Sequence, residues 1–304
     1  MDRNIKQIVV FGDSFMAGDE LLQNKHLDNI IPILDRYKAS IAPTGKLQCQ
    51  QKDLRAIRDA INCYFDKEYP NPQDRRSAEF KETYASKLGE RLDVPVINYA
   101  RPGNSNLGIY ESFLQFKNRI DSNTLVLIGT TYINRYTQLT PKAIIHETNQ
   151  YLKDEQIAEV LQSWGTTIPH HSSQANEKKH KTFYELDSMF GNDGYFKYLQ
   201  FISTLYSIKY MLGDIPHYFF CNTGNHTIQF VDLATDLHLI PPHKRYYIRQ
   251  ELDKLIVPYS LQECRIALQE QNLPFSALFG HVNSDVHTHY SDYLFNFLKD
   301  NNQL

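Results

Sequence analysis

The chain has 304 residues, of which 41% are hydrophobic and 22% are charged, and its formal net charge is −3. This composition is typical of a soluble globular protein with a substantial core, and it excludes an intrinsically disordered chain. Both signs of charge are mixed along the sequence, which argues against nucleic acid as a partner, because phosphate neutralisation needs clustered lysine and arginine.

Two further classes are excluded by the absence of their signals. No apolar run is long enough to span a bilayer, and the first residues lack the apolar stretch of a secretory signal. We therefore expect no membrane partner and a protein that is cytoplasmic as synthesised, or that sits in a virion if a phage encodes it. The four cysteines form no Cys-x-x-Cys pair, so we predict neither a metal site nor a redox motif, and no cofactor.

The first predicted element is a buried strand over residues 8–11, an apolar run rich in β-branched residues. Gly12-Asp13-Ser14 breaks this run and places Ser14 where the strand ends. Ligands of open parallel α/β sheets bind outside the carboxyl ends of the strands. Ser14 is therefore a candidate nucleophile, although Gly-Asp-Ser is also a common loop sequence.

A long polar segment, about residues 19–73, follows the serine. Leu54, Ile57 and Ile61 mark one amphipathic helix within it. Because the segment is too long for a simple strand-to-helix connection, we predict an insertion beside Ser14.

The middle of the chain alternates helices with strands. A helix that Ser77 would cap precedes a strand over residues 94–100, and a helix through Ile109 precedes a strand over residues 124–128. This order predicts parallel pairing with right-handed crossovers, and hence an α/β fold.

The last part of the chain continues the pattern after a second, mostly helical insertion over about residues 132–213. A fourth strand is predicted at 217–221, followed by a helix at 260–271 and a final helix after Asp285-Val286-His287. We expect one domain, residues 1–304, that carries the two insertions.

Three segments of the chain resemble the motif blocks of the SGNH, or GDSL-like, hydrolases. Gly12-Asp13-Ser14 matches the first block, the segment from Asn98 to Ser105 the second, and Asp285-Val286-His287 the last. The resemblance implies a three-layer α/β/α, flavodoxin-like parallel sheet and a Ser-His-Asp triad. Ser14 would be the nucleophile, His287 the base, and Asp285 the acid that orients the imidazole.

The resemblance also implies an oxyanion hole formed by Ser14, Gly103 and a donor from the third block. That block is usually Gly-x-Asn-Asp, but Thr131 stands at the asparagine position here. A threonine hydroxyl can donate one hydrogen bond, with a shorter reach, and Asn134 is a second candidate donor. The acid also departs from the family pattern, because Asp285 precedes His287 by two residues instead of three.

The neighbouring His289 leaves two alternatives open. It could replace His287 as the base. On an extended segment, Asp285, His287 and His289 would point the same way and resemble metal ligands. No further ligand pair supports a metal, so none is predicted, and the remaining histidines, including His281, are interpreted as core or surface residues.

The leading functional interpretation is a serine hydrolase that cleaves carboxylic esters through an acyl-enzyme, with O-acetyl groups on a carbohydrate as an example. Its partner would be a small-molecule or carbohydrate ester, and the sequence does not indicate an oligomeric state. The alternative is an SGNH-fold binding or structural protein with weak or no catalysis, for example a virion component.

Overall fold

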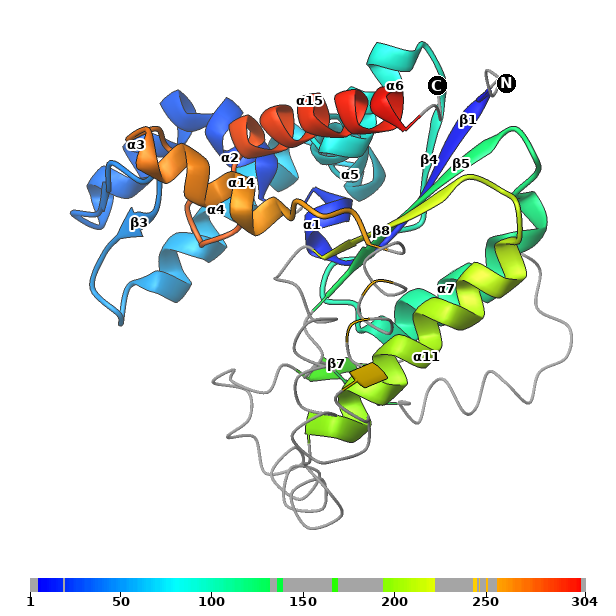
Figure 1. The fold of residues 1–304 in the computed structure, drawn as a ribbon. Helices are drawn as coiled ribbons and strands as arrows, with labels where there is room; N and C mark the ends of the chain where they lie inside the picture. Colours follow the sequence, from blue (N-terminus) through cyan, green and yellow to red (C-terminus); the bar gives the residue numbers. More distant parts are fainter. Residues whose placement is uncertain are drawn as a thin grey trace, which may run out of the picture.

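The centre of the protein is a four-stranded parallel sheet (Figure 1). The computed structural model describes residues 5–18, 20–131, 136–138, 166–168, 194–221, 243, 244, 246, 250 and 256–301. The sheet has the order β4-β1-β5-β8. Its strands are β1 (Gln7–Phe11), β4 (Val96–Asn98), β5 (Thr124–Thr130) and β8 (His217–Cys221). The predicted α/β class and parallel pairing are confirmed.

Register places the ends of the central strands side by side. Phe11 pairs with Ile128, and Ile128 pairs with Phe219. Ser14 lies three residues after Phe11, and Thr131 lies three residues after Ile128. The two residues follow the ends of neighbouring strands. Ser14 and Thr131 therefore share the carboxyl edge of the sheet.

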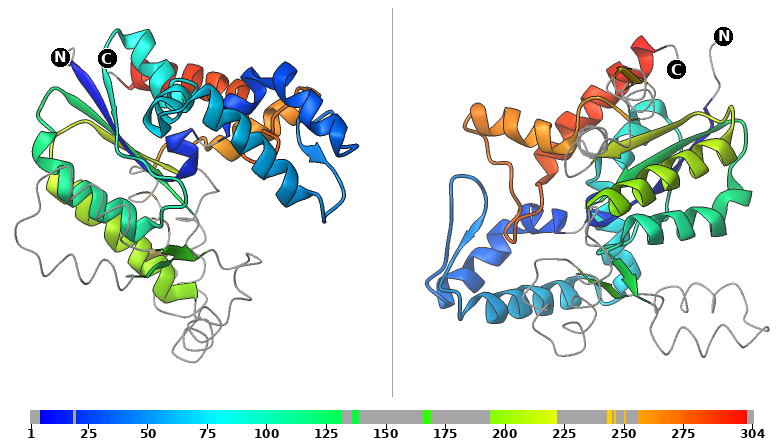
Figure 2. Two further views of the ribbon diagram at one scale, coloured as in Figure 1. Left: turned by 180° about the vertical axis from the view of Figure 1, so that it is seen from behind. Right: turned by 60° about the horizontal axis from the view of Figure 1, so that its bottom comes forward.

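Helices cover both faces of the sheet (Figures 1 and 2), an arrangement compatible with a three-layer α/β/α fold. On one face lie α6 (Tyr84–Leu92), α14 (Leu261–Glu270) and α15 (Ser284–Asp300); on the other lie α7 (Asn106–Phe116) and α11 (Gly194–Leu212). The strand residues alternate between the two cores, with Ile8 and Val10 facing α6 while Val9 and Phe11 face α7. Burying one such side chain contributes about 1.5–3 kcal/mol.

The region before α6 differs from its prediction. Two helices stand there instead of one, because α5 (Pro72–Lys81) begins at its cap Asn71 and α6 begins at its cap Thr83. The predicted cap, Ser77, lies inside α5, where its hydroxyl donates to the carbonyl of Gln73 at 2.8 Å.

The first insertion forms a hydrophobic cluster of its own. It contains α2 (Leu21–Lys25), α3 (Leu27–Arg36), the short strands β2 (Ser40–Ile41) and β3 (Leu47–Gln48), and α4 (Leu54–Glu68), which is the predicted amphipathic helix. Ile30, Ile61 and Phe65 are buried in this cluster together with Leu278 from near the end of the chain. The insertion therefore packs against the segment between α14 and α15.

The second predicted insertion is described only in part. Strands β6 (Tyr136–Gln138) and β7 (Thr166–Ile168) pair in antiparallel fashion. Near its end, 19 residues form α11, which packs on the sheet as the crossover between β5 and β8 and is thus part of the core fold. Among the described residues, no helix combines the length and apolar character needed to cross a membrane.

Candidate active site

Ser14 lies where the sequence predicts it, at the carboxyl end of β1. It is the first residue of α1 (Ser14–Ala17), a single short turn. Asp13 caps this turn by accepting a hydrogen bond from the backbone N–H of Phe15 at 3.1 Å. The cap fixes the direction in which the Ser14 side chain leaves the strand, and only 3% of Ser14 is exposed.

The imidazole beside Ser14 belongs to His281. Its Nε2 lies 3.0 Å from Ser14 Oγ, within the range that allows proton transfer between the two groups. The ring also contacts Phe15 edge-on, with 5.3 Å between ring centroids. In the backbone, the N–H of Ala277 donates to the carbonyl of His281 at 2.7 Å, which closes a tight loop. Packing and backbone bonds therefore both hold the imidazole against the serine.

The other ring nitrogen of His281 faces a carboxylate from the first insertion. Glu20 Oε2 lies 3.1 Å from His281 Nδ1 and 3.5 Å from the backbone nitrogen of the same residue. Glu20 has a φ of 70°, in the left-handed region that a non-glycine residue rarely adopts, and its side chain makes no capping bond to α2. Strain of this kind persists only where surrounding structure imposes it, and it concentrates at functional sites.

Arg58 of α4 supports both Glu20 and the loop that carries His281. Its Nη2 lies 3.9 Å from Glu20 Oε1, and its guanidinium stacks over the ring of Phe279 at 4.5 Å. The carboxylate is thus held between an arginine and an imidazole. The chain Arg58, Glu20, His281, Ser14 links the insertion to the end of β1.

This arrangement supplies the groups that nucleophilic catalysis needs. A serine hydroxyl is a weak nucleophile until a base accepts its proton. His281 can accept that proton through Nε2, and Glu20 can steady the imidazolium that forms. The distances are therefore compatible with a Ser-His-Glu triad, in which the contact between His281 Nδ1 and Glu20 is an ion-pair distance.

The predicted base, His287, does not occupy this position, and the structure corrects that assignment. His287 lies in the first turns of α15, is 1% exposed, and accepts a hydrogen bond at Nδ1 from the backbone N–H of Tyr84 at 3.2 Å. Its ring stacks on that of Tyr84, with centroids 5.6 Å apart. Burial, followed by the charges of Lys87 and His281, lowers the pKa of His287 to about 3. His287 is thus a neutral acceptor that ties α15 to α6.

The predicted acid and the alternative base are also corrected. Asp285 and His289 are exposed on α15, and Asp285 accepts a hydrogen bond from the side chain of Asn283 at 3.4 Å. The sequence prediction assumed an extended segment, but Asn283 caps the helix here by accepting from the N–H of Val286. Helical spacing turns His287 away from Asp285 and His289. The described part of the chain contains no group of three or more His, Cys, Asp or Glu that could hold a metal ion.

The predicted oxyanion donors flank Ser14. Gly103 has a φ of 74°, and its turn is tied to the nucleophile loop because the N–H of Arg101 donates to the carbonyl of Gly12 at 3.1 Å. Thr131 is fully buried, and its hydroxyl has no hydrogen-bond partner among the described residues. Asn134, the second candidate donor, lies outside the described residues.

Asn106, which sequence reasoning missed, fixes the position of Thr131. Its side-chain oxygen accepts from the N–H of Thr131 at 2.9 Å, and its side-chain nitrogen donates to the carbonyl of Thr131 at 3.1 Å. This two-point contact joins the start of α7 to the end of β5. It fixes the backbone that carries the buried hydroxyl at the strand end.

His281 and Glu20 escaped the sequence analysis for a specific reason. The family pattern has an aspartate three residues before the histidine, and Leu278 occupies that position relative to His281. The acid comes from 261 residues earlier in the chain. The sequence offered one signal for the acid: Glu20 comes six residues after Ser14, the residue at the carboxyl edge of the sheet.

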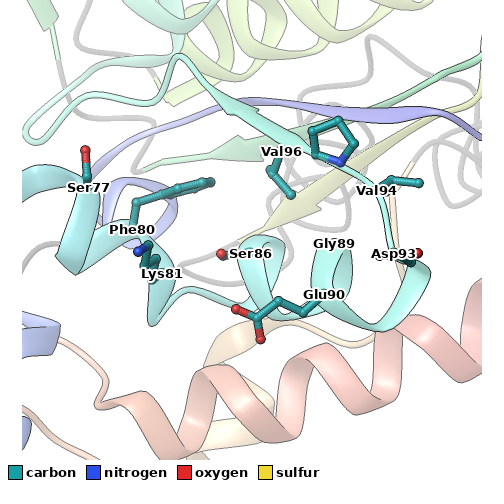
Figure 3. Close-up of a pocket in the computed structure, with 10 residues that line it drawn as sticks. Ser77, Phe80, Lys81, Ser86, Gly89, Glu90, Asp93, Val94 and Val96 are labelled. Atoms are coloured by element: carbon teal, nitrogen blue, oxygen red, sulfur yellow. The ribbon is translucent and has the colours of Figure 1, made fainter.

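Two cavities lie near the ends of β4. One, of about 370 Å³, lies near its carboxyl end, where Ala17, Asn98 and Pro102 are among the lining residues. The other, of about 550 Å³, lies at the start of β4 between α5 and α6, where Lys81, Glu90 and Val94 are among the lining residues (Figure 3). Only the first is on the same edge of the sheet as Ser14.

Comparison with known proteins adds no relative: no family model, no curated protein and no solved structure matches this chain.

Proposed function

We propose that the protein is a serine hydrolase that cleaves carboxylic esters, with O-acetyl groups on a carbohydrate as its expected substrate. The observation that carries the proposal is the contact of 3.0 Å between Ser14 Oγ and His281 Nε2, with Glu20 3.1 Å from the other ring nitrogen. A nucleophile, a base and an orienting acid in this order form the constellation from which acyl transfer is recognised on unrelated folds.

The mechanism follows from these positions. Ser14 Oγ attacks the ester carbonyl while its proton passes to His281 Nε2, and the charge that develops on the carbonyl oxygen is stabilised by hydrogen-bond donors. The backbone N–H groups of Ser14 and Gly103 and the hydroxyl of Thr131 are the proposed donors. His281 then gives its proton to the leaving alcohol, and water hydrolyses the acyl-enzyme with His281 again as base.

Membership of the SGNH-like hydrolases is part of the proposal. The strand order β4-β1-β5-β8 is 2-1-3-4 when these four strands are numbered along the chain, which is the beginning of the flavodoxin-like order. The first and second motif blocks also lie beside each other, through the bond from Arg101 to Gly12. The departure is the acid, which is Glu20 instead of an aspartate near the histidine.

A fluorophosphonate probe tests the function directly. Ser14 Oγ should displace fluoride from phosphorus, so mass spectrometry should find the label on Ser14, and Ser14→Ala should abolish it. His281→Ala should reduce labelling by at least about a hundredfold, because the serine then lacks its base. His289→Ala is the matched control, since this histidine is exposed on α15 and should leave labelling unchanged.

Two outcomes would contradict the proposal. Folded protein that neither reacts with the probe nor hydrolyses aryl acetates would support the alternative of a binding or structural protein on this scaffold. Loss of labelling in His287→Gln with retention in His281→Ala would return the role of base to His287.

A further inference from the structure

The cavity of about 370 Å³ adjoins the candidate active site. It is bounded by the end of α1, by α4 and α5, and by the residues after β4. Ala17 lines it one helical turn after Ser14, and Pro102 lines it next to Gly103. A substrate group in this cavity would therefore be separated by few covalent bonds from an ester carbonyl held at Ser14.

Two consecutive arginines of α5 line the cavity, and the first is fully compensated. Arg75 Nε lies 3.3 Å from Glu79 Oε1, and Arg75 Nη1 lies 3.8 Å from Asp66 Oδ1. Its guanidinium also stacks over Phe65 at 4.8 Å. Arg75 therefore neutralises both acidic residues of the cavity wall and has its position fixed by them.

Arg76 has no such compensation. Within the described part of the chain, no carboxylate forms an ion pair with it. The charge of Arg76 instead repels another cation, Arg101. Arg101 lies in the chain between the lining residues Ala100 and Pro102. Burial and then the charge of Arg76 lower the pKa of Arg101, while Glu111 raises it.

Arg76 is exposed, so water screens its repulsion with the half-buried Arg101, and Glu111 offsets part of the charge of Arg101. Arg76 thus presents a solvated positive charge at the cavity. An anion bound here would remove the repulsion, and the planar fork of a guanidinium matches a carboxylate or a phosphate.

We propose that this cavity binds a negatively charged group of the ester substrate, a carboxylate or phosphate near the scissile bond, with Arg76 as its charged ligand. The proposal rests on the proposed esterase function and specifies its substrate class. An acetyl ester of an acidic sugar carries both the ester bond and the negative charge, and so does the ester of a dicarboxylic acid.

Matched ester pairs test the proposal on both sides of the scissile bond. On the acyl side, p-nitrophenyl hemiglutarate is compared with p-nitrophenyl valerate, which has a methyl group in place of the terminal carboxylate. On the alcohol side, p-carboxyphenyl acetate is compared with phenyl acetate. The measured quantity is the ratio of kcat/KM for the anionic ester to that for the neutral ester.

The substitution Arg76→Gln should lower this ratio by about tenfold in one of the two pairs, because a hydrogen bond to a charged group corresponds to that factor or more. Arg76→Lys should restore part of it. Arg55→Gln is the control for net charge, since Arg55 lies on α4, away from the cavity lining, and its side chain is 94% exposed. A ratio that Arg76→Gln leaves unchanged in both pairs would overturn the proposal.

Direct binding separates failure of the cavity from failure of the esterase. Glutarate is titrated calorimetrically into Ser14→Ala, with and without Arg76→Gln, and the second substitution should weaken its Kd by about tenfold. If glutarate shows this difference and no ester is hydrolysed by the unmodified protein, the cavity stands and the esterase fails. Equal glutarate binding by both variants would overturn the cavity proposal whatever the hydrolysis data show.

Discussion

At the scale of single residues, the candidate site depends on how three polar residues are held by their neighbours. Phe15 packs against the edge of the His281 ring, Arg58 holds Glu20, and Asn106 holds the backbone of Thr131 at two points. Each neighbour removes rotational freedom before substrate arrives, and such preorganisation makes a polar site effective.

Glu20→Gln tests the assignment of the acid. The amide keeps the size of the side chain but cannot stabilise an imidazolium by charge, so kcat for an aryl acetate should fall by about a hundred- to ten-thousandfold. Thermal unfolding should change little, which separates catalysis from folding. Glu90→Gln, an equal change at an exposed acid on α6, should leave kcat as it was, and an equal fall in both variants would contradict the role of Glu20.

His287 should give the protein a distinctive acid sensitivity. Its pKa lies at about 3 in the folded state against an ordinary value of 6.5, so between these values the unfolded chain binds the extra proton. The free energy of unfolding should therefore decrease as pH falls through this window, by up to about 1.4 kcal/mol per pH unit from this group. Urea denaturation from pH 7 to pH 4 should show a shallower decrease for His287→Gln than for the unmodified protein. His289→Gln is the exposed control, and a slope identical in all three proteins would contradict the assignment.

At the scale of elements, the start of helix α15 is fixed by its cap. Asn283 is fully buried, its side-chain oxygen accepts from the N–H of Val286 at 3.1 Å, and its side-chain nitrogen donates to the carbonyl of Pro274 at 3.0 Å. One residue thus starts the helix and anchors the preceding loop, two positions after His281.

Asn283→Ala should therefore cost more than loss of an ordinary cap. The cap itself contributes about 1 kcal/mol, and the lost hydrogen bond to the carbonyl of Pro274 adds about 0.5–1.5 kcal/mol. Ser260→Ala is the comparison, because Ser260 caps α14 through a capping box and should cost only the first amount. Denaturant unfolding measures both, and equal losses would show that the bond to Pro274 contributes nothing.

The elements also show what the sequence could and could not predict. The strand before Ser14 and the helix through Leu54 were predictable because apolar periodicity is a local property. Ser77 was misplaced because two helices in succession share one apolar pattern, and Asp285 because a cap two residues earlier starts the helix before it. His281 and Glu20 could not be paired, since their contact depends on how the insertion packs against the end of the chain.

At the scale of the whole molecule, the first insertion contributes residues to the candidate site and also packs against the segment that carries His281. It contributes Glu20, and its hairpin holds the loop before His281 through the bonds from the N–H of Phe275 to the carbonyl of Thr44 and from the N–H of Leu47 to the carbonyl of Leu278. The sheet contributes Ser14. The proposed base and acid are thus positioned by packing between the insertion and the segment that precedes α15.

Gly45→Ala should disturb catalysis through this packing. Gly45 has a φ of 92°, and a Cβ atom there would lie 2.2 Å from the carbonyl oxygen of Ser276, so the loop carrying His281 would have to move. We expect kcat to fall by at least about tenfold, since misplacement by about 1 Å can cost a hundredfold. Gly213→Ala has a similar backbone strain with nothing within 4 Å, and it should leave kcat unchanged. Equal kcat values for the two variants would show that the hairpin does not position His281.

The separation of His281 from its two partners has a consequence for the growing chain. Ser14 and Glu20 leave the ribosome almost together, whereas the imidazole that lies between them in space follows 261 residues after Glu20. A nascent polypeptide that ends before residue 281 carries Ser14 without its proposed base, so we expect its hydroxyl to be unreactive. Hydrolytic competence would thus be acquired late in translation, when the sheet and the insertion have both been made and the last segment closes over them.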